Sequence, residues 1–144
     1  SFATRPWQHV LEPLSGYIAL AYGLSKNNDL NGEAFNFGPP ANQNHTVTEL
    51  VDEITLHWPG SEWVDKSKKY SSLEESELLK LNCDKALHIL GWQATLNFKE
   101  TSEWTAKWYR NYYENGPESA SEFTVNQIKE YMELANKRNS FKFW

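Results

Sequence analysis

The chain has 144 residues and a formal net charge of −5, and 40% of its residues are hydrophobic. This is the size of one domain with its own core, so we expect residues 1–144 to form one unit. No apolar run approaches the roughly 20 residues that a membrane crossing needs. The acidic balance, with lysines clustered only at Lys66, Lys68 and Lys69, argues against a nucleic-acid partner. The single cysteine, Cys83, excludes an internal disulfide and fits a reducing cytoplasm.

The N-terminal third predicts a helix, a turn and a short strand. Apolar residues recur at helical spacing over about 12–25, with Pro13 in the first turn, where its missing N–H costs nothing. Asparagines and a glycine at 27–32 predict a turn. Residues 34–37 then predict a short strand that ends at Gly38.

A capping pattern marks three further helix starts, because a short polar side chain followed three residues later by Glu or Gln satisfies free N–H groups at a helix end. The pairs are Thr46 with Glu49, Asn97 with Glu100, and Thr124 with Gln127. The second pair precedes Trp104, Trp108 and Tyr112, which share one helix face. We expect these aromatic residues to belong to the core.

The middle of the chain predicts two more strands, a brief one at 62–64 and another at 78–81. Asn82 is a suitable cap for a short helix that Gly91 ends, with Trp92 packing back onto it. The alternation of helices and strands predicts a mixed α/β fold.

The sequence offers no familiar catalytic or metal-binding template. It lacks the G-x-S-x-G, H-E-x-x-H and P-loop patterns, and no glycine-rich dinucleotide fingerprint follows a strand. The four histidines, His9, His45, His57 and His88, have no metal-ligand spacing. We therefore expect no metal site and no catalytic residue in these residues, and an inert Cys83 thiol.

Several segments nevertheless carry a specific resemblance. They are RPWQHVLEPLSGYIALA at 5–21, EAFNFGP at 33–39, TVTELV at 46–51, LKLNCDKALHILGW at 79–92, EWTAKWYRNYY at 103–113 and FTVNQIKEY at 123–131. In this order they resemble the C-terminal part of extended short-chain dehydrogenase/reductase enzymes that act on sugar nucleotides. The run RPWQHVLEPL is typical of the branch that uses CDP-glucose, whereas a segment ending in LGW is common to many members.

The resemblance implies an NAD-dependent 4,6-dehydratase. In such enzymes NAD oxidises C4 of the sugar, water leaves across C5 and C6, and the hydride returns to C6. The NAD fingerprint and a Tyr-x-x-x-Lys catalytic pair lie in an N-terminal Rossmann domain, and the resemblance implies that this chain begins after both. We therefore expect an inactive substrate-binding fragment of a homo-oligomeric enzyme. The alternatives are another nucleotide-sugar epimerase or decarboxylase, or a separate interaction module.

The resemblance matches Arg5 with an arginine that meets the substrate diphosphate, a role that suits a planar bidentate cation. The alternative is a surface arginine. If the segment is extended, alternation places His9 on the Arg5 face and leaves Gln8 to support the adjoining chain. Asn36 either hydrogen-bonds a ligand or holds the following loop.

One stretch departs from the family pattern. A His-Glu-Ala-His-Tyr-like run is expected before the 79–81 segment, but the sequence there reads EESEL at 74–78. Glu75 keeps the acidic position, where it is expected to accept hydrogen bonds from ribose hydroxyls. The alternative is a solvated acidic stretch. The histidine and tyrosine positions are replaced, which leaves the nucleotide specificity open.

Overall fold

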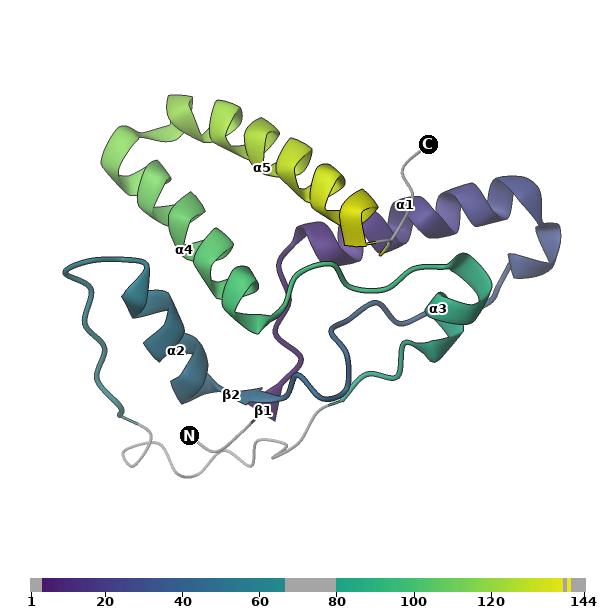
Figure 1. Cartoon of the computed structure of the whole chain (residues 1–144), viewed down its shortest axis with the longest axis horizontal. Coiled ribbons are helices and arrows are strands. Elements are labelled where there is room, and N and C mark those ends of the chain that lie inside the picture. The colour runs from purple at the N-terminus through teal and green to yellow at the C-terminus, as the bar shows by residue number, and fades with distance from the viewer. Residues whose placement is uncertain (1–3, 67–79, 139, 141–144) are drawn as a thin grey trace.

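The computed structural model describes residues 4–66, 80–138 and 140 and is mostly helical, with a small β component (Figure 1). Its elements are β1 (Thr4–Arg5), α1 (Leu11–Lys26), the 3-10 turn η1 (Asn28–Leu30), β2 (His45–Thr46), α2 (Val47–Leu56), α3 (Asp84–Leu90), α4 (Phe98–Asn115) and α5 (Pro117–Arg138). The two strands pair antiparallel, with Thr4 opposite Thr46 and Arg5 opposite His45. The predicted mixture of helices and strands is therefore present, but helices make up most of the described residues and the two strands are short.

Two of the three capping pairs start helices as predicted. At α2 the Thr46 hydroxyl accepts the Glu49 N–H at 3.1 Å, and the Glu49 carboxylate accepts the Thr46 N–H at 2.6 Å. The same reciprocal pair, Asn97 with Glu100, opens α4 at 3.0 and 2.9 Å. These local bonds satisfy N–H groups that have no partner within the helix, so the sequence pattern alone locates the start.

The third predicted start is wrong. Helix α5 begins at Pro117, directly after Gly116 with φ of 80°, so Thr124 and Gln127 lie inside it. A proline needs no N–H partner in a first turn, which makes Pro117 a sufficient helix start. Thr124 instead donates to the Ala120 carbonyl at 2.7 Å, as serine and threonine do inside helices.

The predicted strands do not form in the described residues. Residues 34–37, 62–64 and 80–81 have no ladder partner, and 78–79 lie outside the described residues. A strand requires a neighbouring strand for its N–H and C=O groups, and a short apolar run does not reveal whether one is present. Phe37 is buried for another reason, because its ring packs edge-on against Trp92 with centroids 4.9 Å apart.

Helix α3 follows the prediction closely. Asn82 Oδ1 accepts the Asp84 N–H at 2.9 Å, one residue before the cap position at Cys83. Gly91 ends the helix at φ of 65°, a conformation that favours glycine. Trp92 then folds back, donating its N–H to the Ala86 carbonyl at 3.2 Å, and its side chain is fully buried.

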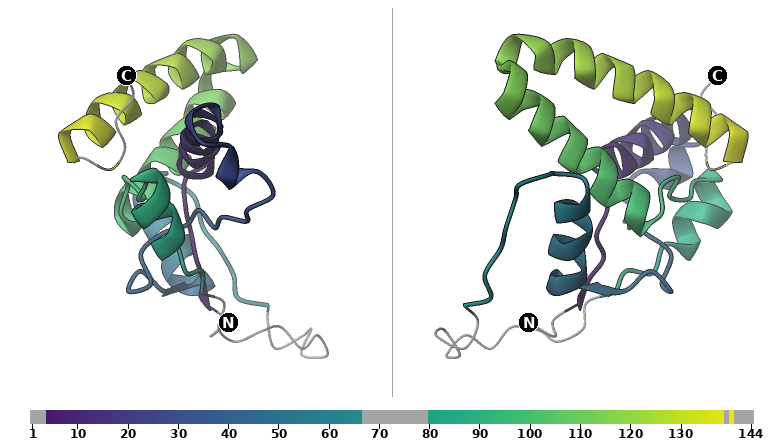
Figure 2. Two further views of the ribbon diagram at one scale, coloured as in Figure 1. Left: turned by 90° about the vertical axis from the view of Figure 1, so that its right-hand side faces the viewer. Right: turned by 60° about the vertical axis from the view of Figure 1, so that its left-hand side comes forward.

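Helix α1 lies between two apolar clusters. Figure 2 shows α5 above α1 and α4 beside the start of α1; α4 also contacts both α5 and α2. One cluster joins the second half of α1 to α3, and the other joins its start to the turn before α4 and to α5. The clusters are Ala19, Phe37, Ala86 and Trp92, and Leu96, Tyr131 and Ala135.

The aromatic face of α4 is less buried than expected. Trp104 and Trp108 are half-buried and Tyr112 is exposed, while the fully buried positions of this helix are mostly small. Trp104 packs against the cluster that contains Tyr131 and Ala135 of α5, and Trp108 Nε1 donates to the Thr124 hydroxyl of α5 at 2.8 Å. Among the described residues, no helix is both long and apolar enough for a bilayer crossing.

Candidate functional site

Arg5 lies in the small β-ladder next to the start of α2. Its Nη1 donates to the Thr4 carbonyl at 2.8 Å, and the side chain is partly buried. The opposite residue, His45, stacks on Phe98 with centroids 3.7 Å apart and brings Nδ1 within 3.5 Å of the Glu49 carboxylate. The ladder therefore joins Arg5 to the capped end of α2.

Gln8 behaves as the sequence predicted. Its Nε2 donates to the Phe37 carbonyl at 3.1 Å, so the amide supports the adjoining chain. His9 instead turns into the start of α1, where its carbonyl accepts the Glu12 N–H at 3.0 Å. Its ring is buried, accepts the Leu11 N–H at Nδ1 at 3.3 Å, and meets Trp104 edge-on. Burial lowers the pKa of His9 to about 4, so the imidazole is neutral at pH 7.

His9 lines a cavity of about 440 Å³ between the start of α1, α4 and α5, which we call the His9 cavity. Its lining residues are Gln8, His9, Val10, Leu11, Thr105, Trp108, Tyr109, Thr124 and Gln127. None of these lining side chains carries a charge at neutral pH. An aromatic and apolar enclosure with a few polar groups is the usual character of a small-molecule site.

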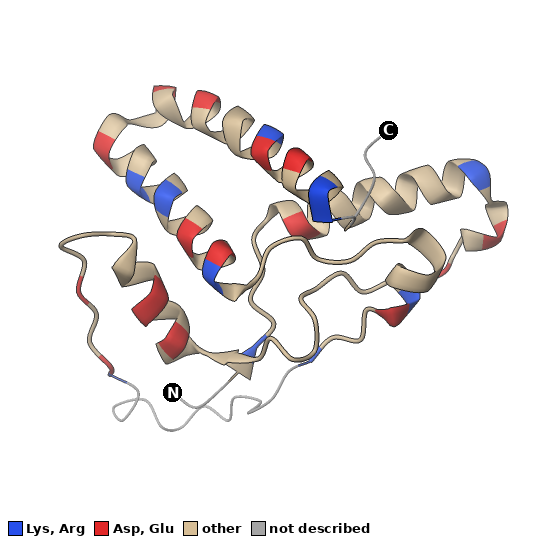
Figure 3. Ribbon diagram, viewed as in Figure 1, with Lys and Arg blue, Asp and Glu red and all other residues tan. Residues whose placement is uncertain are grey.

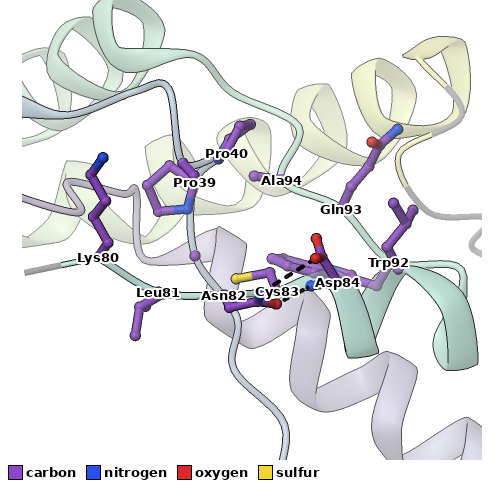
Figure 4. A pocket seen from close by; sticks show the side chains of 13 residues that line it. Pro39, Pro40, Lys80, Leu81, Asn82, Cys83, Asp84, Trp92, Gln93 and Ala94 are labelled. Carbon is purple, nitrogen blue, oxygen red and sulfur yellow. Dashed lines mark hydrogen bonds between the residues drawn. The ribbon is translucent and has the colours of Figure 1, made fainter.

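Asn36 connects to a second cavity through the loop before α3. Its Nδ2 donates to the Asn82 carbonyl at 3.2 Å, the loop-holding role that was one of the two expectations. Asn82 lines a cavity of about 450 Å³, which we call the Lys80 cavity (Figure 4). Its other lining residues are Gly38, Pro39, Pro40, Ala41, Lys80, Leu81, Cys83, Asp84, Leu87, Trp92, Gln93 and Ala94.

The Lys80 cavity has mixed chemistry. Asn82 and Asp84 form one polar edge, with a 3.3 Å hydrogen bond between their side chains. Lys80 lies at the other end of the segment from Lys80 to Asp84 in Figure 4. Burial raises the pKa of the Cys83 thiol, so the thiol form is favoured there. Glu75, the fourth residue selected from the sequence, lies outside the described residues. The structure thus divides the selected residues among separate places.

The sequence analysis missed the most buried polar group, Glu12, which is 1% exposed. Its carboxylate accepts hydrogen bonds from the N–H groups of Thr95 and Leu96 and from the hydroxyl of Tyr131. Burial raises the pKa of Glu12, and these hydrogen bonds only partly offset that effect. Ser15 extends the network, with its hydroxyl 3.0 Å from the Tyr131 oxygen. The available signal was spacing, because Glu12 shares a helix face with the other buried residues of α1.

A Tyr-x-x-x-Lys spacing does occur, at Tyr22 and Lys26, although the resemblance implied a pair outside this chain. Both residues lie at the exposed end of α1, and the Lys26 ammonium sits 5.4 Å from the centre of the Tyr22 ring. Neither lines the His9 or Lys80 cavity. Within the described ranges, His, Cys, Asp and Glu side chains form no cluster of three or more suited to a metal ion.

No protein-family model matches the chain. Part of the chain is similar to a sugar-nucleotide dehydratase. It is 37% identical over 110 residues to the CDP-glucose 4,6-dehydratase of Salmonella typhimurium. The match covers 76% of this chain and 30% of the relative, so the chain spans about a third of the relative's length.

Proposed function

We propose that this chain is the substrate-binding part of an NAD-dependent dehydratase that converts CDP-glucose to CDP-4-keto-6-deoxyglucose. The observation that carries the proposal is the 37% identity over 110 residues to a CDP-glucose 4,6-dehydratase. Identity at this level over most of the chain supports a common fold in the matched region. The region matched is a minor part of the relative, so the proposal concerns binding rather than the chemical step.

In this proposal Arg5 binds the diphosphate. A guanidinium presents parallel N–H donors to phosphate oxygens, and the pairing of β1 with β2 fixes the backbone from which it extends. His9 and Asn36 are proposed to contribute from separate places, His9 from its cavity and Asn36 through the loop that it holds against Asn82. Glu75 is proposed to accept hydrogen bonds from the ribose.

NAD is part of the proposal, but the described residues do not fit it. A dinucleotide site needs a strand, a glycine-rich turn and a helix whose N-terminus meets the pyrophosphate. The two described strands have two residues each, and the glycines with positive φ, such as Gly91 and Gly116, lie at helix ends. We therefore propose that NAD and the proton-transferring residues belong to another part of the enzyme.

Calorimetric titration of the 144-residue chain with CDP-glucose, UDP-glucose and ADP-glucose tests the binding role. We expect CDP-glucose to bind more tightly than the other two. The three ligands differ only in the base, so a difference in affinity measures recognition of the base. Equal affinities would contradict the assignment to CDP-glucose and favour another nucleotide-sugar enzyme. Absence of binding by all three would favour a separate interaction module.

Incubation of the chain with CDP-glucose and NAD tests whether the chemical step needs residues outside this chain. We expect no 4-keto-6-deoxy product, because the described residues contain no strand, glycine-rich turn and helix arranged to hold a dinucleotide. Turnover by the purified chain would contradict this placement of the chemistry. The coding sequence upstream provides a second test, since a glycine-rich βαβ start followed by Tyr-x-x-x-Lys is expected there.

A further inference from the structure

The sequence contains two Asn–Gly pairs, Asn31–Gly32 and Asn115–Gly116. In such a pair the asparagine side chain can react with the peptide nitrogen of the glycine, because glycine has no side chain to hinder the approach. The reaction depends on the fold, since the peptide must rotate and the two reacting groups must be free of hydrogen bonds. The two pairs differ in this respect.

Asn31 and Gly32 are the central residues of a tight turn that follows α1 and η1 (Figure 1). The Glu33 N–H donates to the Leu30 carbonyl at 3.1 Å and closes the turn. Asn31 has φ of −67° and ψ of 122°, and Gly32 has φ of 84°. These are the angles of a type II turn, in which the closing bond uses the N–H of the fourth residue. The N–H of the third residue, Gly32, takes no part in it.

Both reacting groups of the first pair are accessible. Asn31 and Gly32 are exposed. In the part of the chain that the structure describes, neither the Gly32 N–H nor the Asn31 side chain has a hydrogen-bond partner. A Cβ added to Gly32 would meet no atom within 4 Å. The turn therefore leaves room for the peptide to rotate and for the side chain to approach it.

The second pair is held at both groups. The Gly116 N–H donates to the Tyr112 carbonyl at 2.9 Å and completes the end of α4. Asn115 Nδ2 donates to the Asn111 side-chain oxygen at 3.0 Å. Pro117 follows directly, and a proline restricts the backbone of the residue before it. The same two residue types are thus free in one place and fixed in the other.

We propose that Asn31 is a site of spontaneous deamidation, in which the Gly32 nitrogen attacks Cγ of Asn31. The N–Cγ bond forms as the Cγ–Nδ2 bond breaks, and the proton of the Gly32 N–H leaves with the amino group as ammonia. A cyclic imide remains, and water opens it at either carbonyl. The products at this position are aspartate and isoaspartate, and water is the only co-reactant. The inference does not depend on the proposed function.

The modification would change both the charge and the backbone of the turn. Each product adds a carboxylate between Asp29 and Glu33, and Glu33 already forms an ion pair with Lys85. Isoaspartate also adds a methylene to the main chain, so the angles of a type II turn are lost. Leu30, the first residue of the turn, is buried beside Gly23 of α1. We therefore expect the isoaspartyl form to be less stable than the unmodified chain.

Peptide mapping by mass spectrometry tests the site in the 144-residue chain incubated at pH 8. We expect the peptide that contains Asn31 to exchange NH2 for OH and to separate into an aspartyl and an isoaspartyl product. Asn115 should react at least about tenfold more slowly, because two hydrogen bonds must break before its ring can close. Equal rates, or a faster reaction at Asn115, would overturn the proposal.

The unfolded chain provides the reference rate. In concentrated urea both Asn–Gly pairs lose their surroundings, so we expect them to react at similar rates. Folding should then slow Asn115 about tenfold or more and leave Asn31 close to its unfolded rate. Equal protection of the two residues by the fold would contradict the role given to the turn. Formation of aspartate alone at position 31 would indicate direct hydrolysis and would overturn attack by Gly32.

Two variants test the assignment to one residue. Asn31→Gln keeps the amide but lengthens the side chain by one methylene, which disfavours the five-membered ring. The incubated unaltered chain should accept methyl groups from an isoaspartyl methyltransferase, and the Asn31→Gln chain should lose this labelling. Asn115→Gln is the matched control and should be labelled as the unaltered chain is. Undiminished labelling of folded Asn31→Gln would show that the reactive residue lies elsewhere.

Discussion

The phenolic hydroxyl of Tyr131 donates a 2.8 Å hydrogen bond to the carboxylate of Glu12, across 119 positions of sequence. The Leu96 N–H donates to the same carboxylate at 2.7 Å, and the Thr95 N–H lies 3.0 and 3.1 Å from its two oxygens. One buried side chain thus joins the start of α1, the turn before α4 and the second half of α5. Its removal affects three parts of the fold together.

Glu12→Ala is expected to lower the free energy of unfolding by about 3 kcal/mol or more, since it leaves several buried donors without an acceptor. Glu12→Gln should cost about 1 kcal/mol or less, because one amide oxygen can still accept the N–H groups and the amide N–H can face Tyr131. Urea unfolding at pH 7 measures both. Glu133→Gln, exposed on α5, is the control, and equal losses for Ala and Gln would contradict this account of the site.

His9 predicts a specific loss of stability in acid. Its folded pKa of about 4 lies below the ordinary value of 6.5, so the folded state resists protonation. The stabilisation is complete above about pH 6.5 and is lost as the pH falls towards 4, by about 3 kcal/mol at most. His9→Asn removes this titration and should flatten the curve of unfolding free energy against pH in that interval. A curve parallel to that of the unaltered chain would show that His9 is accessible to protons in the fold.

Gly16→Ala should destabilise the protein, although alanine is ordinarily the better helix former by about 1 kcal/mol. An added Cβ would lie 2.3 Å from a ring carbon of Phe37, which is itself held against Trp92. Overpacking of this kind costs about 1–3 kcal/mol. Gly23→Ala is the matched control, because its nearest neighbour is the end of the Leu90 side chain at 2.9 Å. Thermal unfolding compares them, and a more stable Gly16→Ala protein would contradict the packing described.

The exposed face of α1 should make the chain self-associate. Leu14, Tyr17 and Ile18 are exposed on neighbouring turns, and contiguous apolar surface of this kind promotes association. Leu14→Gln with Ile18→Gln is expected to reduce light scattering and the binding of a hydrophobic dye, with stability changed by about 0.5 kcal/mol or less. Leu20→Gln, which places an amide in the core, should destabilise instead. A monomeric unaltered chain that binds no dye would contradict this prediction.

Arg5 should matter most in an enzyme that also contains the NAD-binding part. There Arg5→Ala is expected to weaken CDP-glucose binding by about 1.5–3 kcal/mol, the scale of a charge-assisted hydrogen bond. Arg5→Lys should recover only part of the loss, because lysine lacks the bidentate fork. In the 144-residue chain the same changes should alter CDP affinity little. Calorimetry on both proteins measures this, and unchanged affinity in the longer one would leave Arg5 without a phosphate role.

Some of the ion pairs on the helices can be predicted from the spacing of charged residues in the sequence. Figure 3 shows acidic residues on α2 and residues of both signs along α4. The pairs Lys107 with Glu103 and Arg110 with Glu114 lie four residues apart on one face of α4. Arg138 instead reaches Glu100 from α5 with bonds of 2.6 and 2.8 Å. No local spacing predicts that pair, because it depends on how α5 crosses the start of α4.

The sequence by itself determined the features that depend on neighbouring residues. The capping pairs at Thr46 and Asn97, the glycine end of α3 and the fold-back of Trp92 all rest on bonds within a few positions, so spacing and residue type were sufficient. The same reasoning failed at Thr124, where a capping spacing occurs inside a helix that Pro117 had already begun. Local signals identify possible starts, and the chain uses those compatible with the helices already formed.

Only the tertiary structure decided which polar groups are buried and which selected residues meet. Burial depends on what packs from elsewhere in the chain: Glu12 needs the turn at Thr95 and the helix that carries Tyr131 before its carboxylate has partners. His9 and Gln127 are 118 positions apart in sequence and form one cavity because α5 crosses the start of α1. A hydrogen bond or cavity wall between distant segments has no sequence period, since its geometry arises from packing that involves the whole chain.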